Sequence, residues 1–288
     1  MSLPAEAPLL LPCICVLLLL ASTATSSTDS FVFGGCSQLK YTPGSPYETA
    51  VNSLLTSLVN SAEFSTYNNF TVPGPGSAPE DTVYGLFQCR GDLSADDCSK
   101  CVTRAVSRLG TLCVGSCGGA MQLDGCFIKY DNTSFLGVED KAVLFKKCGP
   151  LIGLDSEGTT ERDSLLGSVV GSDGAYKPYR AGWSGDARAV AQCVQDLSAS
   201  ECQDCLTEAI TQLKTNCQAA KWGDMFLGKC YVRYSEGGDH SHDGHGSSND
   251  DEIEKTLAIL IGLIAGVALI IVFLSFLARV CDRGKGGK

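Results

Sequence analysis

Hydrophobic residues repeat one helical pattern at two places in the chain. Apolar side chains recur with the i, i+3, i+4 spacing of one buried helical face over residues 51–59 and again over residues 165–170. The positions are Val51, Leu54, Leu55, Leu58 and Val59 in the first place and Leu165, Leu166, Val169 and Val170 in the second. The spacing predicts an amphipathic helix in each.

A second helix is predicted downstream of each of these. Ser94 and Ser198 are each followed three residues later by an acidic residue, as at a helix N-terminus. The apolar faces then comprise Cys98, Cys101, Val102, Ala105, Val106 and Leu109, and Cys202, Cys205, Leu206, Ala209, Ile210 and Leu213. Residues 121–130 and 225–234 alternate and are rich in aromatics, which predicts strands. We therefore predict two α+β modules, each with two helices packed on an antiparallel sheet.

Two longer apolar runs differ from this amphipathic pattern. Residues 9–21 are too few to span a bilayer and small residues follow them, so we predict a signal peptide over residues 1–27. Residues 257–278 carry no charge and as a helix extend about 33 Å, which is enough to cross a membrane. Acidic residues precede this run and basic residues follow it, which favours a cytoplasmic C-terminus. We predict a single-pass type I membrane protein with a cytoplasmic tail at 279–288.

Three residues of this C-terminal part are candidates for membrane function. Gly262 and Gly266 have the spacing that lets two transmembrane helices approach closely, although glycine is also common in such helices for other reasons. Cys281 lies just beyond the apolar run, where it is either palmitoylated or a reduced cytosolic thiol.

The cysteines define the repeat. Five cysteines recur 104 positions later, and Cys36 and Cys148 open the two copies at a different offset. The five pairs of positions are Cys89 and Cys193, Cys98 and Cys202, Cys101 and Cys205, Cys113 and Cys217, and Cys126 and Cys230. We predict disulfide-rich modules at 29–139 and 142–239, joined by a stalk at 240–256 to the membrane helix.

Helix geometry narrows the cysteine pairing. Cys101 and Cys113 lie roughly 18 Å apart along one helix, too far for a disulfide. We expect Cys98 to form a disulfide with the nearby Cys89. This leaves Cys101 and Cys113 to pair with Cys36 and Cys126 in either order. Cys117 has no counterpart in the second copy. It is predicted unpaired, and it either cross-links two molecules, senses redox state or is buried and inert.

Composition excludes several classes of function. A net charge of -10 argues against a nucleic-acid partner. The three histidines, His240, His242 and His245, all lie in the stalk, so the modules lack a base for a Ser-His or Cys-His system. The histidines form either a weak metal site or part of a solvated stalk. We predict no catalytic residues, no cofactor and no metal site, and we expect N-glycosylation at Asn69 and Asn132 in surface loops.

The cysteine spacing resembles a known repeat. Both copies contain C-x8-C-x2-C and then C-x11-C, and they carry the related segments QLDGCFIKY and FLGKCYVRY. These features resemble the cysteine-rich repeat of the plant antifungal protein ginkbilobin and of cysteine-rich receptor-like kinases. Two such repeats with one membrane helix and a short tail look like a member of the plasmodesmata-located protein family. The resemblance implies six disulfides: Cys36 to Cys113, Cys89 to Cys98, Cys101 to Cys126, Cys148 to Cys217, Cys193 to Cys202, and Cys205 to Cys230.

The resemblance also carries expectations about function. It implies residence at plasmodesmata in the plasma membrane, control of cell-to-cell permeability through callose deposition, and docking of viral movement proteins. Ginkbilobin binds mannose through an Asn, an Arg and a Glu, whose places are taken here by Ser37, Ala120 and Asp131 and by Gly149, Asp224 and Ser235. Mannose binding is therefore not expected.

Three hypotheses follow for the function. The leading one is a non-catalytic plasmodesmal membrane protein that regulates symplastic trafficking, with callose synthases and other membrane proteins as partners. In this hypothesis the chain forms either a homo-oligomer or a hetero-oligomer. The second is a carbohydrate-binding, antifungal defence ectodomain that contacts cell-wall glycan. The third is a co-receptor for a membrane receptor kinase.

Overall fold

The computed structural model describes residues 27–76, 79–151, 156–171 and 176–236. Most of the predicted signal peptide, the stalk and its histidines, the membrane helix with Gly262 and Gly266, and the tail with Cys281 lie outside the described residues. Within the described ranges no helix has the length and apolar character needed to cross a membrane.

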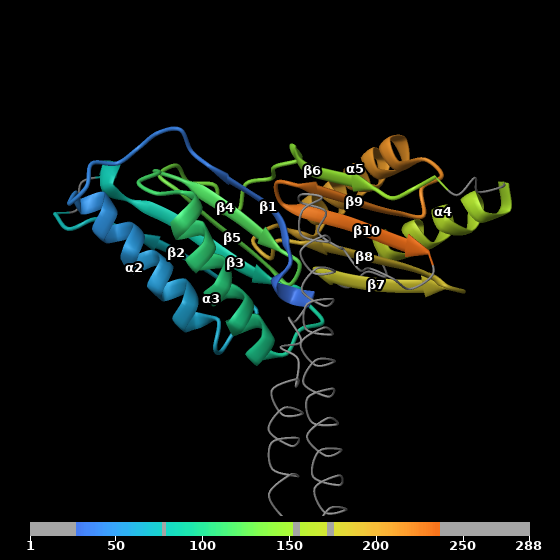
Figure 1. Cartoon of the computed structure of the whole chain (residues 1–288), viewed down its shortest axis with the longest axis horizontal. Coiled ribbons are helices and arrows are strands. Elements are labelled where there is room, and N and C mark those ends of the chain that lie inside the picture. The colour runs from blue at the N-terminus through green and yellow to red at the C-terminus, as the bar shows by residue number, and fades with distance from the viewer. Residues whose placement is uncertain (1–26, 77–78, 152–155, 172–175, 237–288) are drawn as a thin grey trace, which may run out of the picture. The chain divides into compact units, whose positions relative to one another are not determined.

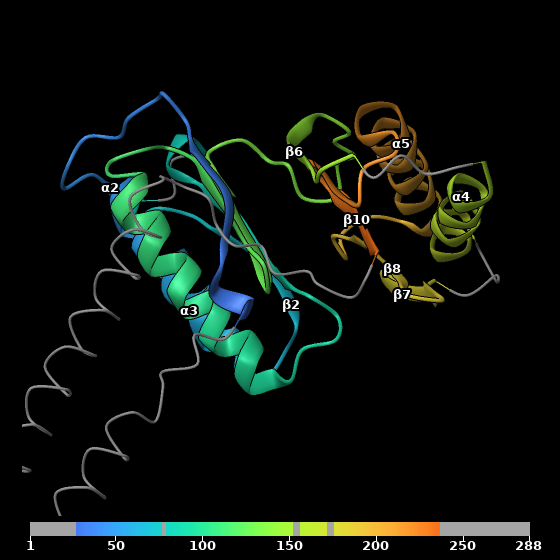
Figure 2. The same ribbon diagram turned by 45° about the vertical axis from the view of Figure 1, so that its right-hand side comes forward.

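The first module is a five-stranded antiparallel sheet with two helices on one face (Figure 1). The strands lie in the order β1-β4-β5-β3-β2. In chain order the elements are η1 Ser27–Asp29, β1 Phe31–Cys36, α2 Pro46–Ser61, β2 Tyr67–Val72, η2 Pro79–Asp81, β3 Val83–Cys89, α3 Ala95–Leu112, β4 Gly119–Leu123 and β5 Cys126–Asp131. Figure 1 shows α2 and α3 side by side, and Figure 2 shows both helices on the same face of the sheet.

The second module repeats this topology. Its strand order, β6-β9-β10-β8-β7, matches that of the first module strand for strand. Its elements are β6 Val143–Cys148, α4 Ser156–Val170, β7 Tyr179–Ser184, β8 Ala187–Cys193, α5 Ala199–Cys217, β9 Trp222–Leu227 and β10 Cys230–Glu236. The predicted fold class, two α+β modules of antiparallel sheet and two helices, is confirmed.

The second helix of each module, α3 and α5, begins where the sequence predicts. The Ser94 side chain accepts a hydrogen bond from the backbone N–H of Asp97, and Ser198 forms a reciprocal capping box with Glu201. An N-cap that the pattern did not reveal is Ser45, which starts α2 with Pro46 in the first turn. These caps satisfy backbone donors that the helix itself leaves unpaired.

Each module has its own core between the helices and the sheet. In the first, Leu54, Leu58 and Leu109 are at most 1 % exposed, and burial of each such side chain stabilises the fold by about 1.5–3 kcal/mol. Leu55 and Val106 lie at the margin of the apolar stripe and are half-buried. The second core is built in the same way around Leu166, Leu206 and Leu213.

The helix-free faces of the two sheets contact each other, and all the described residues lie in one compact unit. A third apolar cluster joins Leu86 and Phe127 of the first module to Val194 of the second. The ring of Phe33 in β1 stacks on Phe145 in β6 with a centroid distance of 6.1 Å. The sequence pattern did not reveal this contact, which covers part of the second face of each sheet.

Candidate functional site

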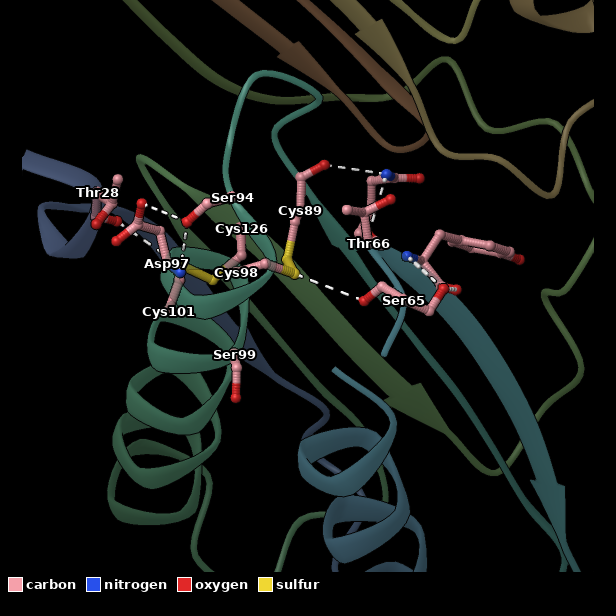
Figure 3. The surroundings of a disulfide bond; sticks show 12 residues. Thr28, Ser65, Thr66, Cys89, Ser94, Asp97, Cys98, Ser99, Cys101 and Cys126 are labelled. Atoms are coloured by element: carbon pink, nitrogen blue, oxygen red, sulfur yellow. Dashed lines mark hydrogen bonds between the residues drawn. A yellow bond between two sulfur atoms is a disulfide. The ribbon is translucent and has the colours of Figure 1, made fainter. Parts of the chain in front are cut away.

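Six disulfides fasten the helices to the sheets. The structure pairs Cys36 with Cys113, Cys89 with Cys98, Cys101 with Cys126, Cys148 with Cys217, Cys193 with Cys202, and Cys205 with Cys230. These are the pairs that the resemblance implies, and they resolve the order that helix geometry left open. Figure 3 shows Cys98 and Cys101 in the first turns of α3, beside the cap formed by Ser94 and Asp97. The two bridges therefore fix the start of α3 to β3 and to β5.

Cys117 is the free cysteine among the described residues, and it is buried with 6 % of its surface exposed. Burial raises the pKa of its thiol, and the carboxylate of Asp131 raises this pKa further, whereas Lys40 acts in the opposite direction. Because the thiolate is the reactive species, both the raised pKa and the limited access slow its reactions.

We expect this thiol to react slowly with N-ethylmaleimide at neutral pH in the folded chain and to add one equivalent when the chain is unfolded with its disulfides intact. The rate should increase as pH rises towards the raised pKa, because the thiolate fraction grows. Mass spectrometry of the secreted fragment 28–250 measures the adduct, with Cys117→Ser as the control. A covalent dimer on non-reducing electrophoresis that disappears in Cys117→Ser would contradict the buried, unreactive state.

Buried charges join the modules. Arg233 in β10 is 6 % exposed, and its guanidinium donates to Asp224 of its own module at 2.9 Å and to Asp124 of the first module at 2.6 Å. Asp124 also pairs with Arg90. Burial opposes the charge on Arg233, but Asp224 and Asp124 outweigh it and raise the Arg233 pKa. The charge persists, and Asp124 bridges two arginines from different modules.

Two equivalent glutamines add polar contacts to the same interface. The side chain of Gln192 donates to the carbonyl of Cys89 at 2.9 Å, and the side-chain oxygen of Gln88 accepts from the backbone N–H of Gln195 at 3.1 Å. Gln88 and Gln192 occupy corresponding places in β3 and β8, and both are buried. The two copies therefore use the same strand position to contact each other.

The residues that link β5 to β6 also contact the second module. Lys229 is 2 % exposed, pairs with Asp196 and donates to the carbonyl of Phe135 at 3.0 Å. Asp196 accepts from the backbone N–H of Gly137 at 2.9 Å. Residues that follow β5 in the chain thus contact the second module through a buried ion pair.

Two of the six positions that correspond to the mannose-binding residues of ginkbilobin are buried, and the other four are partly exposed. Asp224 and Ser235 are 1 % and 0 % exposed, and Ala120 packs against the apolar cluster between the modules. At Gly149 an added Cβ would lie 2.5 Å from the indole nitrogen of Trp222, so the indole lies directly over this backbone. Glycine is required at this close approach.

The sheet of the second module carries a row of four residues across β9, β10, β8 and β7. Strand register places Trp222 opposite Ser235, Ser235 opposite Arg188, and Arg188 opposite Trp183. We call these four residues the tryptophan row. It contains both tryptophans of the chain, separated by three strand spacings or roughly 14 Å.

The tryptophan row lies on the helix-free face. Gly182 and Gly223 face α4 and α5, because a Cβ at either position would meet side chains of those helices, and neighbouring residues in a strand point the opposite way. Trp183 is 77 % exposed, while Trp222 is half-buried with the Lys147 amine 5.6 Å from its ring centroid. The row therefore combines one fixed indole, one accessible indole and the exposed guanidinium of Arg188.

The first copy has no equivalent of this row. Matching the registers of the two sheets places Thr71 where Trp183 lies and Tyr84 where Arg188 lies, and Gly118 corresponds to Trp222. A position-by-position comparison of the copies would have revealed the difference, because exposed aromatics at non-equivalent positions are not needed for the common fold.

The two glycosylation candidates lie in different settings. Asn132 is exposed directly after β5, as expected for a surface loop. Asn69 is exposed too, but it lies within the edge strand β2, and the expectation of a loop is wrong for this residue. The error arises because an edge strand has one solvent-accessible face and therefore tolerates polar residues. No group of three or more His, Cys, Asp or Glu residues suited to a metal ion occurs in the described ranges.

Comparisons with known proteins agree with this architecture. The family model described as Salt stress response/antifungal matches residues 35–133 and 155–237. The chain is 59 % identical to plasmodesmata-located protein 6 of Arabidopsis thaliana over 96 % of this chain and 97 % of that protein. It is 58 % identical to plasmodesmata-located protein 7 of the same plant over 91 % and 87 %. Among solved structures, the tandem DUF26 ectodomain of the Arabidopsis thaliana cysteine-rich receptor-like protein PDLP5 is 46 % identical, with a TM-score of 0.67, over 73 % of this chain and all of that ectodomain.

Proposed function

Since this chain belongs to the plasmodesmata-located proteins, with their tandem salt stress response/antifungal domains, we propose that it regulates cell-to-cell trafficking at plasmodesmata as a non-catalytic membrane protein. The observation that carries the proposal is similarity over 96 % of the chain, well beyond the two modules. Residues 257–278 anchor the chain, with the modules outside the cell and the tail in the cytosol.

The chain acts on cell-to-cell permeability through partner proteins. Regulation of callose deposition passes through membrane proteins that associate with the chain. Gly262 and Gly266 provide close helix contact within the membrane, and palmitoylation of Cys281 strengthens anchoring. The modules supply an external surface, which the interface through Arg233 and Asp124 holds as one unit.

The tryptophan row is the binding surface that we assign to partner recruitment. Tryptophan and arginine are enriched among the residues that dominate binding energy, because each offers a large contact area together with a polar group. Trp183 is accessible, and its exposed neighbour Arg188 lies on β8, an inner strand of a sheet that disulfides attach to its helix. Such a surface needs little reordering on binding.

A fluorescent fusion of the full chain tests the location. We expect paired puncta that cross the wall, together with reduced movement of a dye between cells and increased callose staining at the puncta. A uniform plasma-membrane signal without puncta would overturn the proposed function.

Substitution of Trp183 by alanine tests the binding surface. Because the side chain is 77 % exposed, stability should change by less than about 0.5 kcal/mol, while the effect on dye movement is lost. Phe64→Ala is the matched control, since Phe64 is 86 % exposed in the first module and should retain the effect. Dye movement and callose staining at equal protein abundance measure both variants. Unchanged activity of Trp183→Ala would remove the tryptophan row from the mechanism.

A carbohydrate-binding role is the second candidate, and the tryptophan row favours it. Two indoles roughly 14 Å apart on a sheet face, with the exposed guanidinium of Arg188 between them, suit the stacking of sugar rings. A glycan array probed with fragment 28–250 and with its Trp183→Ala variant separates the candidates. Binding that requires Trp183 supports the carbohydrate role, and no binding on a broad array rejects it.

A further inference from the structure

The two modules differ at their outer edge strands. β2 and β7 each occupy the last place in their sheet and each pairs with one strand, β3 and β8. The other side of an edge strand presents backbone N–H and C=O groups that can pair with another chain. Natural proteins protect such edges with charges, glycines, prolines or bulges.

The sequence of β7 contains such protection. Arg180 and Gly182 lie in this strand, and the Arg180 guanidinium donates to the carbonyl of Val170 at the end of α4 at 2.6 Å. A charged side chain and a glycine both disfavour addition of a further strand. The edge of the second module is therefore protected by its own residues.

The sequence of β2 contains no residue of these kinds, although the backbone N–H groups of Tyr67 and Asn69 donate to the side chains of Ser65 and Asn68. Its six residues, Tyr67-Asn68-Asn69-Phe70-Thr71-Val72, contain no charge, no proline and no glycine. Aromatic, β-branched and asparagine residues in a short uncharged segment are the signature of strands that self-pair. Phe70 and Val72 pack against the core, so a polar residue in either place would weaken the module.

The acceptor Asn69-Phe70-Thr71 lies in the middle of this edge. Asn69 and Thr71 are both exposed and alternate with the core-facing Phe70 and Val72, so they share the helix-free face. The amide nitrogen of Asn69 donates to the hydroxyl of Tyr67 at 2.7 Å. In β7 the corresponding residue is Ala181, and no acceptor exists.

We propose that Asn69 carries an N-linked glycan whose role is to block the free edge of β2 against pairing with a second copy of the chain. A branched oligosaccharide attached at the centre of a six-residue strand is much larger than the strand spacing of about 4.8 Å, so it excludes an added strand. The first module thus obtains by modification the protection that the second obtains from Arg180. This inference does not depend on the proposed function.

The test uses the secreted fragment 28–250, because the equivalent ectodomain of PDLP5 forms a complete crystallised chain. Mass spectrometry should find hexosamine on Asn69. Asn69→Gln and Thr71→Ala both remove the acceptor, while Thr71→Ser keeps it. Light scattering with size-exclusion chromatography should give a monomer for the parent and Thr71→Ser, and a mass at least twofold higher for Asn69→Gln and Thr71→Ala.

Two further variants distinguish edge blocking from general solubility and from misfolding. Asn132→Gln removes a glycan from a residue that does not belong to an edge strand, and it should leave the mass unchanged. Adding Asn68→Arg to Asn69→Gln copies the protection of β7 and should restore the monomer. An unmodified Asn69, a monomeric Asn69→Gln, equal association of Asn132→Gln, or failure of Asn68→Arg to restore the monomer would each overturn the proposal.

Discussion

Replacement of Arg233 by alanine should lower the free energy of unfolding by about 3–5 kcal/mol, because it leaves Asp224 and Asp124 as buried carboxylates without their shared cation. For a domain pair of this size the melting temperature should fall by roughly 6–20 °C. The loss should separate the modules before it unfolds either core, since Arg233 lies at their interface and outside both apolar clusters.

Calorimetry of fragment 28–250 measures this effect, and Arg188→Ala is its matched control. Arg188 lies on the same sheet face but is exposed and has no ion pair within the described residues, so its removal should change stability by less than about 0.5 kcal/mol. Equal melting temperatures for the two variants would show that the buried charges do not hold the modules together.

Removal of the Cys36–Cys113 bridge by the double substitution Cys36→Ala and Cys113→Ala should cost about 4.5 kcal/mol, which is a large share of the stability of one module. The bridge closes a loop with a sequence separation of 77, so it greatly restricts the unfolded chain. It also attaches β1 to the end of α3. Little secreted protein is expected at physiological temperature.

The matched comparison is the Cys89–Cys98 bridge, which has a sequence separation of 9 and whose removal should cost about 2.6 kcal/mol by the same chain-entropy argument. Both experiments are made with Cys117→Ser, so that the free thiol cannot form a substitute bridge. Denaturant unfolding gives the two free energies. A larger loss for the short loop than for the long one would show that native packing, and not chain entropy, dominates.

The features predicted correctly depend on residues close together in the chain. Ser94 and Ser198 cap helices through contacts three residues away, and the apolar stripes repeat within each helix turn. The sequence pattern predicted fewer of the strands than of the helices. β3 is buried on both faces, by α2 on one side and by the second module on the other, so it shows no alternation. The runs at 121–130 and 225–234 proved to belong to hairpins of two strands each.

The amino-acid pattern was sufficient to establish the duplication, the α+β class, the unpaired Cys117 and the starts of α3 and α5, because local periodicity and cysteine register encode them directly. The contact of Arg233 with Asp124, the alignment of Trp183 with Trp222 and the edge position of Asn69 came only from the folded molecule. Each of these three features depends on which strands pair in the sheet and on which face of the sheet the helices or the other module cover. Those choices join residues up to about a hundred positions apart, and no short-range spacing records them.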